Sequence, residues 1–166
     1  MKLLKKMCAI HAPSGEELNM KTFILEHIKN NQNKWSVRPI IHQGDNFQDN
    51  IILVFGEKPR TAIFAHLDSI GFTVGYNNEI IKIGSPITNI GINLVGKDNQ
   101  GYIEGKIIKK ESTLYIDTKR KIERGTSLVF KSEFKENKDY IQSCYLDNRL
   151  GVWNCLQIAK TLENGI

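Results

Sequence analysis

Apolar and polar positions near the start of the chain follow the spacing of a helix. Segment 12–31, APSGEELNMKTFILEHIKNN, is predicted to be a turn followed by a helix, whose apolar face recurs at intervals of three or four residues: Leu18, Thr22, Leu25 and Ile28. This is the period of one face of an α-helix. Pro13 and Gly15 mark the turn, and Ser14 with Glu17 three residues later predicts a capping box at the start of the helix.

Three extended segments are expected after this helix. They are WSVRPIIH at 35–42, NIILVFG at 50–56 and TAIFAHLD at 61–68. The third contains a nearly continuous apolar run: Ile63, Phe64, Ala65 and Leu67. Such a run, bounded by turn residues, predicts a buried strand.

From residue 72 to about 142 the pattern changes to short β-like runs separated by turn residues. The runs are FTVGY, IIKIG, INLVG, GYIEGKIIKK, TLYID and TSLVF. Several short strands at this spacing, with no helical segment between them, predict a small closed or sandwich β domain.

Helical spacing returns in LDNRLGVWNCLQIAKTLENG near the end of the sequence. Its predicted apolar face is Leu150, Trp153, Leu156, Ala159 and Leu162. Gly165 is the expected stop signal. An α/β pattern is therefore interrupted and then resumed. We expect residues 1–70 and 143–166 to form one α/β lobe, and 71–142 to form an inserted β-barrel domain.

Composition narrows the class of protein. With 40% hydrophobic and 25% charged residues, the 166-residue chain has the balance of an ordinary globular protein. It contains no apolar run of 18 residues and no convincing secretion signal, so we expect no membrane partner. The cysteines Cys8, Cys144 and Cys155 have unrelated spacings, which favours reduced thiols and a cytoplasmic location.

The net charge of +5 raises the question of nucleic-acid binding. The basic residues are scattered, however, and the densest cluster, KRKIER at 119–124, accompanies no recognised nucleic-acid motif. A Gly-punctuated barrel could still bind single strands like an OB-fold, but it offers few aromatic residues for stacking. We therefore expect no nucleic-acid partner.

His66 and Asp68 are the first candidate functional residues. Residues i and i+2 of a strand project to the same side, so these two side chains can face one place. An imidazole oriented by a carboxylate suits a metal ligand. The alternative is structural: a histidine satisfied near a strand end, with Asp68 capping the turn before Gly71.

Asp147 is the second candidate. It lies in YLDNRLG, between a strand-like segment and the last helix. Ligands of α/β sheets gather at such strand ends. The alternative is that Asp147 or Asn148 is simply the N-cap of the helix.

The stretches PSGEE, AHLDSIGFTV and YLDNRLG occur in this order around the β block. In this arrangement the sequence resembles the N-terminal half of the two-metal aminopeptidases of the glutamyl aminopeptidase and tetrahedral aminopeptidase type, some of which were once labelled endoglucanases. The resemblance continues into the insert through GYIEGKI, LYID and IERGTSLVF. It implies a partial phosphorylase/peptidase-like α/β lobe with an inserted β-barrel of the dimerisation type.

The resemblance also implies roles for the candidate residues. His66 would bind one divalent ion, zinc or cobalt, and Asp147 would bridge two such ions. Asp68 would be the catalytic support that steadies His66. Two metal ions would polarise the scissile carbonyl and activate a water molecule. The implied reaction is hydrolysis of N-terminal residues from a peptide substrate, in a homo-oligomer assembled through the β insert.

Two departures from the family pattern limit this expectation. Asn148 stands where the family often has a second Asp. The family's catalytic Glu, its neighbouring Glu ligand and a further His come from a later region, and two ligands alone cannot close a zinc site. We therefore expect an N-terminal fragment that is inactive alone. The alternative is a non-catalytic assembly or binding module that retains the first half of the peptidase fold.

Overall fold

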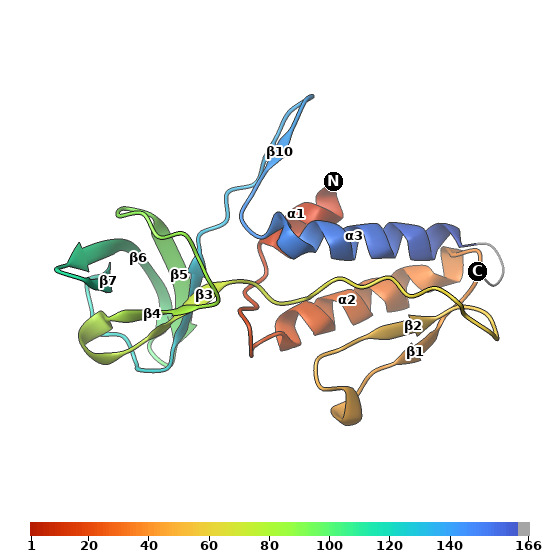
Figure 1. The fold of residues 1–166 in the computed structure, drawn as a ribbon, viewed down its shortest axis with the longest axis horizontal. Coiled ribbons are helices and arrows are strands. Elements are labelled where there is room, and N and C mark those ends of the chain that lie inside the picture. The colour runs from red at the N-terminus through yellow and green to blue at the C-terminus, as the bar shows by residue number, and fades with distance from the viewer. Residues whose placement is uncertain (163–166) are drawn as a thin grey trace. The chain divides into compact units, whose positions relative to one another are not determined.

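A computed structural model describes residues 1–162, which divide into two compact units (Figure 1). The helical unit contains Met1–Ala12, Glu16–Leu67 and the chain from Leu146 onward. The β unit contains Pro13–Gly15 and Asp68–Tyr145. The sequence of the helical unit is therefore interrupted twice by the β unit, first by the short segment Pro13–Gly15 and then by the long segment Asp68–Tyr145.

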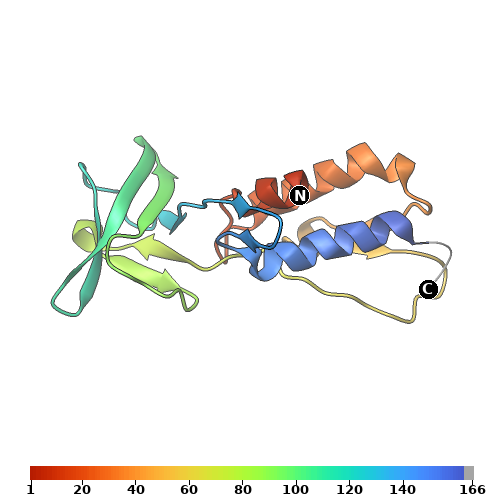
Figure 2. The same cartoon turned by 90° about the horizontal axis from the view of Figure 1, so that it is seen from above.

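Three α-helices and a small hairpin make up the helical unit. The helices are α1 (Lys2–Cys8), α2 (Leu18–Asn31) and α3 (Leu146–Thr161). The antiparallel strands are β1 (Ile40–His42) and β2 (Ile52–Val54). Short 3-10 turns, η1 (Gln32–Lys34) and η2 (Asp45–Phe47), precede the two strands. Figure 2 shows α2 and α3 running side by side.

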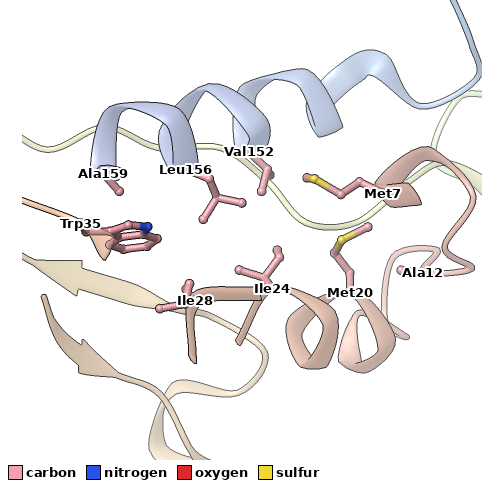
Figure 3. Close-up of a cluster of buried hydrophobic side chains, with 9 residues drawn as sticks. All are labelled: Met7, Ala12, Met20, Ile24, Ile28, Trp35, Val152, Leu156 and Ala159. Carbon is pink, nitrogen blue, oxygen red and sulfur yellow. The ribbon is translucent and has the colours of Figure 1, made fainter. Parts of the chain in front are cut away.

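The core of the helical unit lies between these helices (Figure 3). Its buried side chains are Met7, Ala12, Met20, Ile24, Ile28, Trp35, Val152, Leu156 and Ala159. Ile41 and Leu53, opposite each other in the hairpin, pack against this cluster from the sheet side. Burial of this apolar surface is the main term that holds the three helices and the hairpin together.

Helix α2 is confirmed, and its predicted inner face is right at Ile28 and wrong at Leu18, while its predicted cap is wrong. Leu18 is 61% exposed, whereas Met20 and Ile24 are buried. The helix begins at Leu18, and its N-cap residue Glu17 makes no side-chain capping bond. Ser14 lies too far upstream to cap this helix, and its hydroxyl donates instead to Asp68.

Helix α3 is also confirmed, with a different inner face from the one predicted. The predicted positions from Leu150 to Ala159 are three apart and drift around a helix of 3.6 residues per turn. The structure buries Arg149, Val152, Leu156 and Ala159, a spacing of three and four residues that stays on one side. Leu150 is accordingly 40% exposed. Gly165 lies outside the described residues.

Segment 61–68 is not the buried strand that its apolar run predicts. Within residues 1–162 it pairs with no strand, because its predecessor β2 pairs with β1 instead. Ala65 and Leu67 pack against the core of the helical unit. Ile63 and Phe64 are 59% and 87% exposed. An apolar run is buried only where a neighbouring element covers it. Among the described elements, none covers Ile63 and Phe64.

The β unit is built on a six-stranded antiparallel sheet that is nearly closed (Figures 1 and 2). Its strands are β3 (Gly71–Val74), β4 (Ile80–Ile83), β5 (Asn93–Asp98), β6 (Gly101–Lys110), β7 (Thr113–Asp117) and β8 (Ser127–Phe130). Their order is β4-β3-β8-β5-β6-β7, and a bridge between Glu79 and Tyr115 brings the two outer edges together. Each of the six predicted runs overlaps one strand, and the α/β class is confirmed.

Close backbone contacts inside this sheet require glycine at two positions. A Cβ atom on Gly105 would lie 2.4 Å from the carbonyl oxygen of Asp117, and one on Gly96 would lie 2.5 Å from that of Ser127. The apolar residues around them form a second core: Phe72, Val74, Ile80, Leu94, Ile103, Ile107, Ile116, Ile122 and Leu128. The β unit therefore has a core of its own.

Smaller elements complete the described chain. The turn η3 (Tyr76–Asn78) lies between β3 and β4. Strand β9 (Lys135–Glu136) pairs with β10 (Ile141–Gln142) in a hairpin, and Figure 1 labels β10. This hairpin and α1 were not expected from the sequence. All three cysteines are free, as predicted. No helix within residues 1–162 has the length and apolarity needed to cross a membrane.

A buried ion pair fixes the turn between β5 and β6. The guanidinium of Arg120 donates to both oxygens of Asp98, at 2.6 and 2.7 Å, and the backbone N–H of Gln100 donates to the same carboxylate. The Asp98 side chain has no exposed surface. Hydrogen bonds from Arg120 hold the pKa of Asp98 well below its usual range. The carboxylate therefore stays charged at neutral pH and ties this turn to the 118–126 loop.

We expect Leu156→Ala to lower the free energy of unfolding of the helical unit by about 2–5 kcal/mol, because it leaves a cavity in the core. Both tryptophans, Trp35 and Trp153, belong to this unit, so their fluorescence in a urea titration measures it. The control is Ile158→Ala on the same helix, which removes a side chain that is 40% exposed. Equal losses in the two variants would contradict the core assignment.

We expect Asp98→Asn to lower the melting temperature of the β unit at pH 7 and to make it less sensitive to acid. Because the folded pKa of Asp98 is depressed, its stabilisation is present above the ordinary carboxyl pKa of 3.8 and is lost as the pH falls toward the depressed pKa. All five tyrosines lie in the β unit, so second-derivative tyrosine absorbance follows its melting. A difference in melting temperature between Asp98→Asn and the wild type that stays constant down to pH 2 would contradict this role of Asp98.

Candidate functional site

His66 and Asp147 meet in the helical unit although they are 81 positions apart in the sequence. The imidazole Nε2 of His66 lies 3.1 Å from Oδ1 of Asp147. The two side chains are 50% and 95% exposed. The structure therefore brings together an imidazole nitrogen and a carboxylate oxygen at a position that solvent and ligands can reach.

The irregular start of α3 positions Asp147. Asp147 and Asn148 have non-helical backbone angles, φ −87°, ψ 106° and φ −119°, ψ 31°, and the peptide between them is cis. The side-chain oxygen of Asn148 lies 1.8 Å from where a Cβ atom on Gly151 would be, so this oxygen sits over the first turn of the helix. That Asp147 or Asn148 caps the helix stays a prediction.

Arg149 links the start of α3, which carries Asp147, to the segment that carries His66. Its side chain is completely buried, and its Nη1 donates to the backbone carbonyl of Leu67, the residue after His66. A buried guanidinium is costly unless it is well bonded, so this arrangement restrains both partners. The structure adds a positioning contact that the motif alone did not predict.

Asp68 belongs to the β unit, where the PSGEE stretch holds it. The hydroxyl of Ser14 donates to Oδ2 of Asp68 at 2.5 Å. The backbone N–H of Ser14 donates to the carbonyl of Ser69 at 3.1 Å, and Pro13 forms a parallel bridge with Ser69. Ser14 is therefore a site residue that the sequence reasoning placed in a helix cap. The support of His66 by Asp68 stays a prediction.

The donor set of His66 and Asp147 fits part of a zinc or cobalt site. Imidazole nitrogen and carboxylate oxygen are both common ligands of these ions. Protein zinc sites use three or four such ligands, however. Within residues 1–162, no three His, Cys, Asp or Glu side chains gather in a metal-binding arrangement. The described part of the chain thus supplies two donors at most to one centre.

The cysteines do not offer a nucleophile for hydrolysis by another route. Burial raises the pKa of the Cys144 and Cys155 thiols above the ordinary cysteine value. Cys8 is buried on the inner side of α1. Because the thiolate is the reactive form, the raised pKa values disfavour Cys144 and Cys155 as nucleophiles at neutral pH.

Comparison with known proteins supports the fold. No protein-family model and no curated protein sequence matches this chain. Among solved structures, PhTET1-12s, a dodecamer, superposes with a TM-score of 0.74 at 22% identity and covers 98% of this chain and 57% of its own. The TET1 peptidase of Pyrococcus horikoshii, which can assemble into a tetrahedron or a large octahedral shell, gives 0.71 at 21% identity, with coverages of 97% and 56%.

A third structure, described as a peptidase/endoglucanase candidate, gives a TM-score of 0.69 at 20% identity. It covers 90% of this chain and 50% of its own. The chain thus spans about half the length of these structures. At such identities the comparison establishes a peptidase-like fold, and it does not carry residue roles across.

We expect Arg149→Leu to cost about 1–3 kcal/mol of stability, since the Leu67 carbonyl loses its buried donor. Faster amide exchange in α3, which carries Arg149, should accompany the loss, measured by hydrogen–deuterium exchange. The control is Arg38→Leu, an exposed arginine of the same unit. If exchange in α3 rose equally in both variants, the positioning role of Arg149 would be refuted.

Proposed function

We propose that this chain provides the N-terminal part of a metal-dependent aminopeptidase, with His66 and Asp147 as metal ligands. The observation that carries the proposal is the 3.1 Å approach of these two side chains across 81 positions of sequence. A histidine satisfied at a strand end or a carboxylate used only as a helix cap does not need this convergence. The peptidase-like fold of the solved structures supports the same proposal.

Each residue of this site has a distinct part in the proposal. His66 offers an imidazole nitrogen, and Asp147 offers a carboxylate with two oxygens that can serve two ions. Asp68, oriented by Ser14, is the proposed support of His66. A pair of divalent ions, zinc or cobalt, would supply Lewis-acid activation of the peptide carbonyl and of water. Arg149 keeps the backbone after His66 beside the start of α3.

The remaining ligands and the general base must come from residues outside this set. Two protein donors leave a zinc ion with an open and weakly held coordination sphere. In this proposal the described residues bind divalent metal weakly and do not hydrolyse peptides by themselves. Peptides are the proposed substrate of the completed enzyme. Homo-oligomers formed through the β unit are the proposed assembly, by analogy with the PhTET1 dodecamer.

A second candidate function is a non-catalytic assembly or binding module. The observation that favours it is that no third ligating side chain joins His66 and Asp147 within residues 1–162. A module of this kind would keep the fold and the contact between the two residues without any need for metal. Metal affinity separates the two candidates.

We expect the purified chain to bind Co²⁺ and Zn²⁺ weakly through His66 and Asp147. His66→Ala and Asp147→Asn should each weaken Co²⁺ binding at least tenfold, and Asp68→Asn about tenfold or more, the loss typical of removing a group that orients a ligand. Isothermal titration measures affinity, and the visible absorption of bound Co²⁺ shows whether an imidazole nitrogen is coordinated.

The matched control is His42→Ala, which removes an exposed histidine of the same unit. Its Co²⁺ affinity should equal that of the wild type. Absence of binding in the wild type, or equal binding by wild type and His66→Ala, would favour the non-catalytic module. Hydrolysis of aminoacyl nitroanilides by the chain alone, lost in His66→Ala, would refute only the expectation that the chain is inactive by itself.

A further inference from the structure

Two adjoining cavities lie within the β unit, and the proposed peptidase site uses none of their residues. The larger, of about 620 Å³, is lined by the turn η3, the turn between β5 and β6, and residues 121–124. The smaller, of about 450 Å³, shares Asn99, Glu123 and Arg124 with it. All lining residues belong to the β unit. Ligand sites in proteins have volumes of this order, so the paired cavity is large enough for a small molecule.

Positive charge dominates the lining of the paired cavity. Its three exposed cations are Lys97, Lys121 and Arg124. Within residues 1–162, none of the three lies within ion-pair distance of a carboxylate. Asp98 also lines the cavity, but it is buried and neutralised by Arg120. Among the described lining residues, Glu123 is therefore the one carboxylate that opposes the three cations.

The ring of Tyr76 holds the guanidinium of Arg124. The guanidinium carbon lies over this ring, 4.4 Å from its centroid. Tyr76 is 68% exposed, so the contact does not serve the apolar core of the β unit. A cation–π contact restrains the arginine without using a hydrogen-bond acceptor, and Arg124 donates no hydrogen bond within residues 1–162. Its N–H groups are therefore available to a phosphate or carboxylate, which arginine binds with two parallel hydrogen bonds.

Hydrogen bonds between the surrounding turns fix the walls of the paired cavity. Besides the buried ion pair of the β5–β6 turn, the side chain of Asn78 in η3 accepts from the backbone N–H of Ile122 and donates to the carbonyl of Arg120, both at 2.9 Å. Asn99 donates to Oε2 of Glu123 at 2.8 Å. Three separate turns are thus joined before any ligand arrives. Such preorganisation lowers the entropic cost of binding.

We propose that the paired cavity binds a small polyanion, a molecule that carries two or more phosphate or carboxylate groups. Single unpaired lysines are common on protein surfaces, but here three cations line one cavity and its walls are braced. Several positive groups around one cavity match a ligand with several negative groups. Phosphate and carboxylate share the required chemistry, because both offer oxygen acceptors to a guanidinium and to ammonium groups. This inference does not rest on the proposed peptidase function.

The test is isothermal titration of the metal-free full chain with tripolyphosphate and, separately, with citrate. Divalent ions are left out so that His66 and Asp147 hold no metal that could bind either anion. Tighter binding of tripolyphosphate would assign the site to phosphate ligands, and tighter binding of citrate would assign it to carboxylates. The affinity should fall as the salt concentration rises, because exposed charges are screened.

Charge variants show whether binding occurs at the paired cavity. Arg124→Gln should weaken binding about tenfold, because it removes a charged donor. Glu123→Gln should strengthen binding, because it removes the opposing carboxylate and keeps an oxygen for Asn99. The matched control is Lys109→Gln, which removes an exposed lysine near the other end of β6 from the β5–β6 turn. Its affinity should equal that of the wild type.

Variants of Tyr76 test the contact that holds Arg124. Tyr76→Leu should weaken binding severalfold, because it removes the ring beneath the guanidinium. Tyr76→Phe keeps the ring and should bind like the wild type. Thermal unfolding of each variant, followed by the absorbance of its tyrosines, shows whether the β unit remains folded.

Two results would overturn the inference. One is a folded wild-type chain that binds neither anion. The other is an equal loss of affinity in Lys109→Gln and Arg124→Gln, which would show diffuse attraction by the net charge of +5 instead of a site. Neither result would bear on Co²⁺ binding by His66 and Asp147, so the two proposals fail separately.

Discussion

One buried hydrogen bond organises the candidate site: Arg149 donates to the carbonyl of Leu67. The chain leaves the helical unit after Leu67 and returns to it at Leu146, with the whole β unit between these points. A guanidinium without exposed surface cannot exchange this bond for water, so losing it would leave a buried charge poorly solvated. The bond therefore restrains the exit and the return of the chain, and His66 and Asp147 stand at these two places.

The long insertion is compatible with this arrangement because the β unit stabilises itself. Its sheet is nearly closed and has its own core, and its last residue, Tyr145, is anchored within it: the backbone N–H of Phe130 donates to the Tyr145 hydroxyl at 2.5 Å. At its start, Ser14 and Pro13 bind the chain at Asp68 and Ser69. Both ends of the insertion are thus fixed by local contacts.

The helices and strands that a local sequence pattern specifies were predictable from the sequence. Contacts between residues far apart in the sequence were predictable only in part. The six β runs and helices α2 and α3 follow from periodicity, because alternating and helical patterns record which side of an element is buried. The inner face predicted for α3 was right at Leu156 and Ala159 and wrong at Leu150, because a strict spacing of three ignores the 3.6-residue turn. Ser14 was assigned to a cap because nothing local shows that its partner is Asp68, 54 positions away. His66 and Asp147 were paired through the order of motifs, while Arg149 needed the structure.

The apolar run of segment 61–68 predicts four buried side chains, and only two of them pack against the core. Ala65 and Leu67 pack against the core of the helical unit, whereas Ile63 and Phe64 are exposed. No described element covers these two side chains. The proposed metal site at His66 is also incomplete, because His66 and Asp147 are two donors and a zinc ion in a protein uses three or four. Both features lie on one segment, and the solved structures of this fold have chains nearly twice as long as the matched region. Any neighbour that covered Phe64 would therefore also lie close to His66, where the proposed site lacks ligands. The exposed apolar positions and the incomplete metal site are thus two properties of one extended segment.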